Sequence, residues 1–203
     1  MWKFERIYRE LLLCTFRGVS SVRQVDVALA CGLSIGLVNK TVKKLEEAMA
    51  VEATRSGVRI LSPARLLNLW ATERNIKRDV WQCFRVDHID EIEKSLPQSV
   101  VLSGFSAWAL VSGRRPAEYD QLWFYVSNRD EFDFWFSHVK GKARKTNPNV
   151  FALYADDNHL FRTSQKGVVC LPQIYVDIYS IGGPAASPYF RDIVRDYPSL
   201  SLW

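Results

Sequence analysis

Apolar residues recur at helical spacing in three successive segments near the start of the chain. The first predicts a helix that ends near Gly18, because intervals of three and four residues place its apolar side chains on one face. The expected buried residues are Phe4, Ile7, Leu11 and Cys14. The second segment begins at Ser21, which fits a capping box with Gln24. Its expected buried stripe is Val22, Val25, Ala28 and Leu29.

The third segment follows a turn at Gly32 and has Ser34 as its expected N-cap. The apolar face of this third helix consists of Val38, Val42, Leu45 and Met49. The opposite face consists of Gly36, Lys40, Lys43 and Glu47, flanked by Asn39 and Lys44. This helix is therefore expected to present a basic surface that carries one amide side chain.

Two short strands are predicted directly after the third helix. The segment VEATRSGVRIL alternates apolar and polar residues around a Ser56-Gly57 turn, which is typical of a β-hairpin, and Arg55 and Arg59 lie near its tip. Three helices followed by a basic hairpin are the elements of a winged helix-turn-helix. The stretches LACGLSIGLVNKTVKKLEE and VRIL resemble the DNA-binding domain of this kind in many prokaryotic regulators.

The resemblance and the basic face together predict a double-stranded DNA partner. Lysines suit phosphate contacts, and an asparagine can bond an adenine edge in the major groove. The expected DNA-binding residues are Arg23, Ser34, Asn39, Lys40, Lys43, Lys44, Arg55 and Arg59. Two alternatives stay open: the lysines form an ordinary solvated face, or the winged helix binds protein. Ile35, Gly36 and Leu37 stand where such helices often carry polar residues, so we expect phosphate contacts and groove shape to dominate.

Positive charge is concentrated in the first part of the chain. Residues 1–80 carry fourteen Lys and Arg against eight Asp and Glu, a net charge of +6, whereas residues 81–203 carry thirteen against fourteen, a net charge of −1. This split is typical of a nucleic-acid-binding module joined to a neutral domain. The expected divisions are a winged helix-turn-helix at 1–61, a bridging helix at 62–78 that starts at Ser62-Pro63, and a second domain at 79–203.

The second domain mixes predicted strands and helices without strict alternation. The expected strands are 79–86, 99–103, 121–127, 149–155 and 167–171. The expected helices are 88–97, 104–113, 129–140, 173–181 and a terminal helix that opens at Ser187-Pro188. This mixture predicts an α+β fold.

Two segments resemble the start of the nucleotidyltransferase fold. One is the strand that breaks at Ser103-Gly104 into a helix, and the other is the strand after Asp120. That family holds its metal with two carboxylates one residue apart, but position 122 is Leu. We therefore expect a degenerate domain without catalytic residues. The alternative is a nucleotidyltransferase in which Asp120 and Asp177 converge on a metal and a nucleotide. Asp177 lies among apolar residues, where we expect it to anchor a nearby turn or cap by hydrogen bonds.

Taken with the winged N-terminus, the stretches VVLSGFSAWAL, LWFYVS and LPQIYVDIYSIGG resemble the AbiEi-like regulators and antitoxins of type IV toxin–antitoxin systems. The resemblance implies an autorepressor whose winged domain binds the promoter of its own operon. It also implies that the second domain counters a nucleotidyltransferase-like toxin, which would be the protein partner. A protein-interaction module in which DNA binding is secondary is a further alternative.

Cysteine and histidine spacing predicts neither a disulfide nor a metal site. The four cysteines form no CxxC pair, and the three histidines have no helical spacing among them. No apolar run reaches membrane-spanning length and the first residues do not suit a signal peptide, so we expect a cytoplasmic protein. We also expect no cofactor. The operator sequence and the oligomeric state do not follow from the sequence, which shows no heptad seam.

Overall fold

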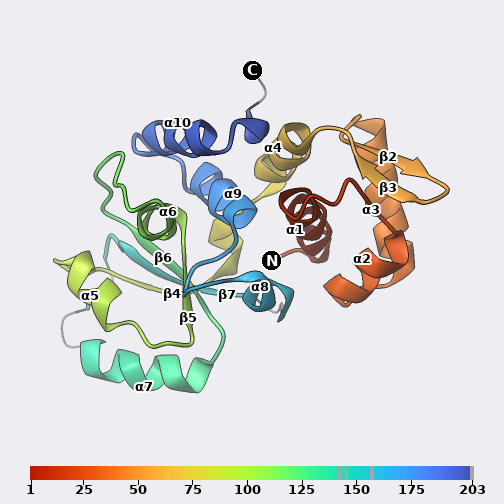
Figure 1. Cartoon of the computed structure of the whole chain (residues 1–203). Helices are drawn as coiled ribbons and strands as arrows, with labels where there is room; N and C mark the ends of the chain where they lie inside the picture. Colours follow the sequence, from red (N-terminus) through yellow and green to blue (C-terminus); the bar gives the residue numbers. More distant parts are fainter. Residues whose placement is uncertain (141–142, 145, 156–157, 202–203) are drawn as a thin grey trace. The chain divides into compact units, whose positions relative to one another are not determined.

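In the computed structural model the chain is α+β, with helices arranged around one three-stranded and one four-stranded sheet (Figure 1). The structure describes residues 1–140, 143–144, 146–155 and 158–201. The chain divides into two compact units. The first unit comprises Trp2–Arg74 and Asp192–Trp203, and the second comprises Met1 and Asn75–Arg191. Among the described residues, no single helix is long and apolar enough to cross a bilayer, and the pair α2–α3, which reaches that length jointly, is bent by 117°.

The first unit is mainly helical. Its elements are α1 (Lys3–Phe16), β1 (Ser21–Val22), α2 (Gln24–Cys31), α3 (Ile35–Glu47), β2 (Val51–Thr54), β3 (Gly57–Ile60), α4 (Pro63–Glu73) and η3 (Pro198–Leu200). The three strands form an antiparallel sheet in the order β1-β3-β2. The predicted hairpin is therefore confirmed, but its turn is Arg55-Ser56, one residue earlier than the predicted Ser56-Gly57. A short strand from the segment before α2 adds to it.

Helix α4, expected to be a bridge, belongs to the first unit. It begins as predicted at Ser62, whose Oγ accepts a hydrogen bond from the backbone N–H of Arg65 at 3.2 Å. Its buried face, Leu66, Leu67 and Trp70, packs against α1, and η3 packs against it from the other end of the chain. Burial of three large apolar side chains fixes α4 to the first unit, so the unit extends to Arg74.

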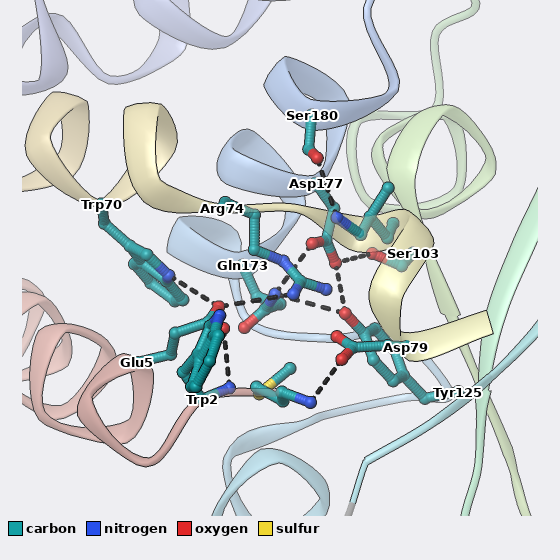
Figure 2. A network of polar contacts seen from close by, with 12 residues as sticks. Trp2, Glu5, Trp70, Arg74, Asp79, Ser103, Tyr125, Gln173, Asp177 and Ser180 are labelled. Atoms are coloured by element: carbon teal, nitrogen blue, oxygen red, sulfur yellow. Dashed lines mark hydrogen bonds and ion pairs between the residues drawn. The ribbon is translucent and has the colours of Figure 1, made fainter.

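Buried charges join α1 to α4, which the sequence pattern did not predict. The Glu5 carboxylate accepts a 3.0 Å hydrogen bond from the Trp70 indole N–H and lies 3.5 Å from the Arg74 guanidinium (Figure 2). Glu5, Arg74 and Trp70 are all buried. A buried carboxylate of this kind is tolerated because a cation and an N–H donor replace its lost hydration.

The predicted buried face of α2 is right only at Ala28. Val25 is 65% exposed and Leu29 is 80% exposed, whereas the buried residues of α2 are Val27, Ala28 and Cys31. The reason is the strand before the helix. Ser21 and Val22 pair with β3 instead of capping α2, so the backbone stays extended through Arg23 and the helix begins at Gln24.

Helix α3 follows its prediction more closely. Gly32 adopts the left-handed conformation with φ 62°, and the Ser34 Oγ accepts a 3.4 Å hydrogen bond from the Leu37 N–H. Val38, Val42 and Leu45 are buried as expected. Met49 is instead 58% exposed, because the helix ends at Glu47 and a positive φ of 55° at Met49 turns the chain into β2.

Gly57 allows β1 to lie close to the hairpin. A Cβ atom on Gly57 would lie 2.5 Å from the Val22 carbonyl oxygen, a backbone atom that cannot rotate away. Gly57→Ala should therefore separate β1 from β3 and lower the free energy of unfolding by about 1–3 kcal/mol, measured by chemical denaturation. Gly18→Ala is the matched control, because Gly18 also has a positive φ but no atom within 4 Å of its Cβ position. Equal losses in the two variants would contradict the steric explanation.

The second unit is built on a mixed sheet. Its elements are η1 (Ile76–Asp79), β4 (Val80–Phe84), α5 (Ile89–Ser95), β5 (Val100–Ser103), α6 (Gly104–Ser112), β6 (Leu122–Val126), α7 (Arg129–Val139), β7 (Val150–Tyr154), α8 (Asn158–Thr163), α9 (Leu171–Ile181) and most of α10 (Ala186–Asp196). The strand order is β4-β7-β6-β5, with β6 and β7 parallel and the other pairs antiparallel.

Helices cover both faces of this sheet (Figure 1). Side chains of α5 and α7, including Ile92, Phe132 and Trp135, share one apolar core with Phe124 of β6. Helices α6 and α9 pack together on the other face. Because both faces are covered, every residue of β6 is buried.

The strand predicted at 167–171 is not formed. Val168 makes isolated bridges with Leu102 and Gln165, and all five residues of this segment are described. Helix α9 begins at Leu171, with Pro172 in its first turn, so the chain leaves the extended conformation after one bridge to β5.

Candidate nucleic-acid interface

The exposed face of α3 carries the first group of predicted DNA-binding residues. Asn39, Lys40 and Lys43 are exposed on the side of the helix opposite Val38 and Val42, which are buried. Across the part of the chain that the structure describes, neither lysine forms an ion pair. Both ammonium groups are therefore available to an external anion.

The tip of the β2–β3 hairpin carries a third available cation. The Thr54 hydroxyl donates a 2.9 Å hydrogen bond to the Gly57 carbonyl oxygen and lies 2.9 Å from the Ser56 hydroxyl, which fixes the turn. Arg55 is exposed within this turn, and no described residue pairs with its guanidinium. The hydrogen-bonded turn thus leaves Arg55 in solvent.

Two other predicted arginines are paired with carboxylates beside them. Arg23 donates to both oxygens of Asp26, with Nε to Oδ2 at 2.8 Å and Nη2 to Oδ1 at 2.9 Å. This hydrogen bonding lowers the pKa of the Asp26 carboxyl and raises the pKa of Arg23. Arg59 donates from Nε to the Glu52 Oε2 at 2.8 Å across the hairpin. Each of these two pairs has no net charge.

Lys44 lies at the border of α3 with its neighbouring helices. Its ammonium group donates to the Glu73 carboxylate of α4 and lies 6.0 Å from the centre of the Phe4 ring of α1. The Tyr8 hydroxyl also donates to Glu73, at 3.4 Å. Burial raises the pKa of Tyr8, and the Glu73 carboxylate raises it further. Lys44 therefore takes part in holding α3 to α1 and α4.

Ser34, the remaining predicted residue, is exposed and starts α3. Its Oγ is engaged by the Leu37 N–H, as described above. The structure thus places Asn39, Lys40 and Lys43 together on one helix face and Arg55 on the hairpin, while the other cations are held by carboxylates.

The sequence prediction did not include the acidic partners Asp26, Glu52 and Glu73. One of them left a local signal, because Asp26 follows Arg23 at the i+3 position. Glu52 lies directly opposite Arg59 because the hairpin turns at Arg55-Ser56, one residue before the predicted Ser56-Gly57 turn. Glu73 left none, because its contact with Lys44 depends on how α4 packs.

In the second unit, Asp177 of α9 lies at the centre of a buried hydrogen-bond network (Figure 2). Its Oδ2 accepts from the Ser103 hydroxyl at 2.7 Å and the Tyr125 hydroxyl at 2.9 Å. Its Oδ1 accepts from the Gln173 side-chain amide at 3.0 Å. Ser103 precedes α6, so the expectation that Asp177 anchors a nearby turn is confirmed.

The turn at Gly104 packs against protein rather than forming an open cradle. A Cβ atom at Gly104 would lie 2.8 Å from the Cδ1 atom of Ile181 of α9, and the φ of +62° at Gly104 favours glycine. A neighbouring pocket of about 450 Å³ is lined by Asp120 and Ile181, among others, and Asp177 is not part of its lining. The described residues contain no group of three or more His, Cys, Asp or Glu arranged to hold a metal ion.

Among the described residues, Lys40 and Lys43 of α3 and Arg55 of the β2–β3 turn are therefore exposed cations without a carboxylate partner, and the one carboxylate of α9 is buried in a hydrogen-bond network. Comparison with protein-family models, curated proteins and solved structures found no match to this chain.

Proposed function

We propose that this protein is a DNA-binding transcriptional regulator whose first unit acts as a winged helix-turn-helix. Helix α3 would enter the major groove, and the β2–β3 hairpin would lie on the adjacent backbone. The observation that carries the proposal is the exposed face of α3. It presents Asn39 beside Lys40 and Lys43, and neither lysine has an ion-pair partner among the described residues.

The hydrogen bonding of Glu46 favours this function over an ordinary solvated face. Carboxylates neutralise Arg23, Arg59 and Lys44, so the available charge is on Lys40, Lys43 and Arg55. Glu46, one turn from Lys43, instead accepts a 2.9 Å hydrogen bond from the Ala53 N–H of β2. Glu46 therefore fixes the hairpin to α3 and leaves Lys43 free. The two elements that would contact DNA are joined by this bond.

The leading end of α3 favours backbone and shape recognition over base contacts. Ile35 is 44% exposed, and Gly36 has no atom within 4 Å of its Cβ position, so this end is apolar and small. Asn39 is the one amide on the face, and Asn can bond an adenine edge. We therefore propose modest sequence discrimination, with most affinity supplied by phosphate contacts.

The proposal extends to an autorepressing antitoxin of a type IV toxin–antitoxin system, acting in the cytoplasm. Its support is the resemblance of the second domain to that family. The packing of Gly104 against Ile181 and the engagement of Asp177 by Ser103 favour a structural over a catalytic role for these residues. The partner would be a nucleotidyltransferase-like toxin, and co-purification with the product of an adjacent gene of that kind would test it.

Selection of duplexes from a random pool by the full-length protein tests the DNA proposal. Enriched duplexes should be footprinted afterwards, and we expect a protected segment whose binding weakens steeply with salt. No enrichment at low salt would contradict the proposal. Calorimetric titration of the same protein with magnesium and each nucleoside triphosphate tests the enzyme alternative, which heat of binding would favour.

A further inference from the structure

We infer that Glu52 attenuates DNA binding by holding Arg59 on the hairpin, and this inference rests on the proposed function. The two residues are direct cross-strand partners on β2 and β3. One carboxylate oxygen of Glu52 accepts from both Nε and Nη2 of Arg59. The side chains are 44% and 56% exposed, so the pair lies on the solvent side of the sheet where a phosphate could compete for the arginine.

The pair has two opposing effects on an approaching duplex. It occupies the edge of the guanidinium that would otherwise bond a phosphate, and it places an exposed carboxylate on the hairpin, where it repels the backbone. Arg55, three residues after Glu52, has no such partner in the described part of the chain. The hairpin is therefore built with one available arginine and one held arginine.

Asp26 holds Arg23 in the same manner at the start of α2, with two hydrogen bonds. The cations left for phosphates in the described region of these elements are Lys40, Lys43 and Arg55. Each phosphate contact contributes about −0.9 to the slope of log K against log salt concentration. Three contacts give a slope of about −3, which is low for a specific DNA-binding protein.

The small number of cations available to phosphates has a functional consequence. Phosphate contacts carry no sequence information, so each one raises affinity for every duplex alike. Holding Arg59 lowers this common affinity and leaves the contribution of groove shape and of Asn39 unchanged. Glu52 thus increases the share of binding energy that depends on sequence, and we assign it the role of a positioning residue that acts through Arg59.

Glu52→Gln tests the inference in the full-length protein, with fluorescence anisotropy of a labelled duplex at several salt concentrations. Releasing Arg59 should add one phosphate contact, steepen the slope by about 0.9 and raise affinity about eightfold at 0.1 M salt. The ratio of affinities for a selected and a random duplex should fall. Glu131→Gln is the charge-matched control, because it removes one negative charge from α7 of the second unit and should leave affinity unchanged.

A second comparison separates release of Arg59 from loss of a repulsive charge. Adding Glu52→Gln to an Arg59→Ala background should produce no steepening of the slope. Unchanged or weaker binding by Glu52→Gln, or equal steepening in both backgrounds, would overturn the inference while leaving DNA binding intact. If neither the native protein nor the variant binds any duplex, the proposed function fails and the inference fails with it.

Discussion

Replacing Lys40 and Lys43 together by alanine is expected to weaken duplex binding roughly 60-fold at 0.1 M salt, because two phosphate contacts would be lost. The slope of log K against log salt concentration should become shallower by about 1.8. Both lysines are exposed on α3, and no described residue pairs with them, so their removal should not disturb the packing of the helix. Anisotropy titrations across a range of salt concentrations measure both quantities.

The matched control for this variant replaces Lys77 and Lys94 by alanine. Both are exposed lysines of the second unit and lie outside the proposed interface. The control removes the same net charge from the protein, so it should retain the affinity and nearly the full slope. If the Lys40/Lys43 variant behaves like the control, α3 does not contact DNA and the proposed orientation of the first unit is wrong.

Local signals in the sequence were sufficient to predict α3 and the hairpin. The left-handed turn at Gly32 and the cap at Ser34 depend on neighbouring residues alone, and the apolar spacing of Val38 and Val42 determines which face is buried. The same reasoning failed for α2. Pairing of Val22 with Val58, 36 positions later, decided where that helix began, and no local pattern encodes such a contact.

The charge of the proposed interface was less predictable than the exposure of its residues. Composition identified a basic region, but ion pairs neutralise three of its predicted cations. The pairing of Lys44 joins residues 29 positions apart, and it follows from the packing of α4 against α1. Counting basic residues therefore overestimates the number of phosphate contacts, since charge can be used inside the fold as well as outside it.

Asp177→Ala is expected to lower the stability of the second unit by about 3 kcal/mol or more. The substitution removes the acceptor for Ser103, Tyr125 and Gln173, and a hydrogen bond to a charged group contributes about 1.5–3 kcal/mol. Because Ser103 immediately precedes α6, loss of the network should loosen the β5–α6 turn first. Hydrogen exchange in β5 and α6, together with thermal denaturation, would locate the effect.

Asp177→Asn distinguishes a structural anchor from a catalytic carboxylate. The asparagine carbonyl can still accept from Gln173, and its amide can donate to the Ser103 or Tyr125 hydroxyl, because a hydroxyl both donates and accepts. A structural role therefore predicts that asparagine restores most of the stability lost with alanine, with little change in hydrogen exchange at the turn. A carboxylate that binds a metal or moves a proton would behave differently, since an amide cannot replace it in that chemistry. Near-native stability of the asparagine variant, combined with loss of magnesium-dependent nucleotide binding, would favour the enzyme over the regulator.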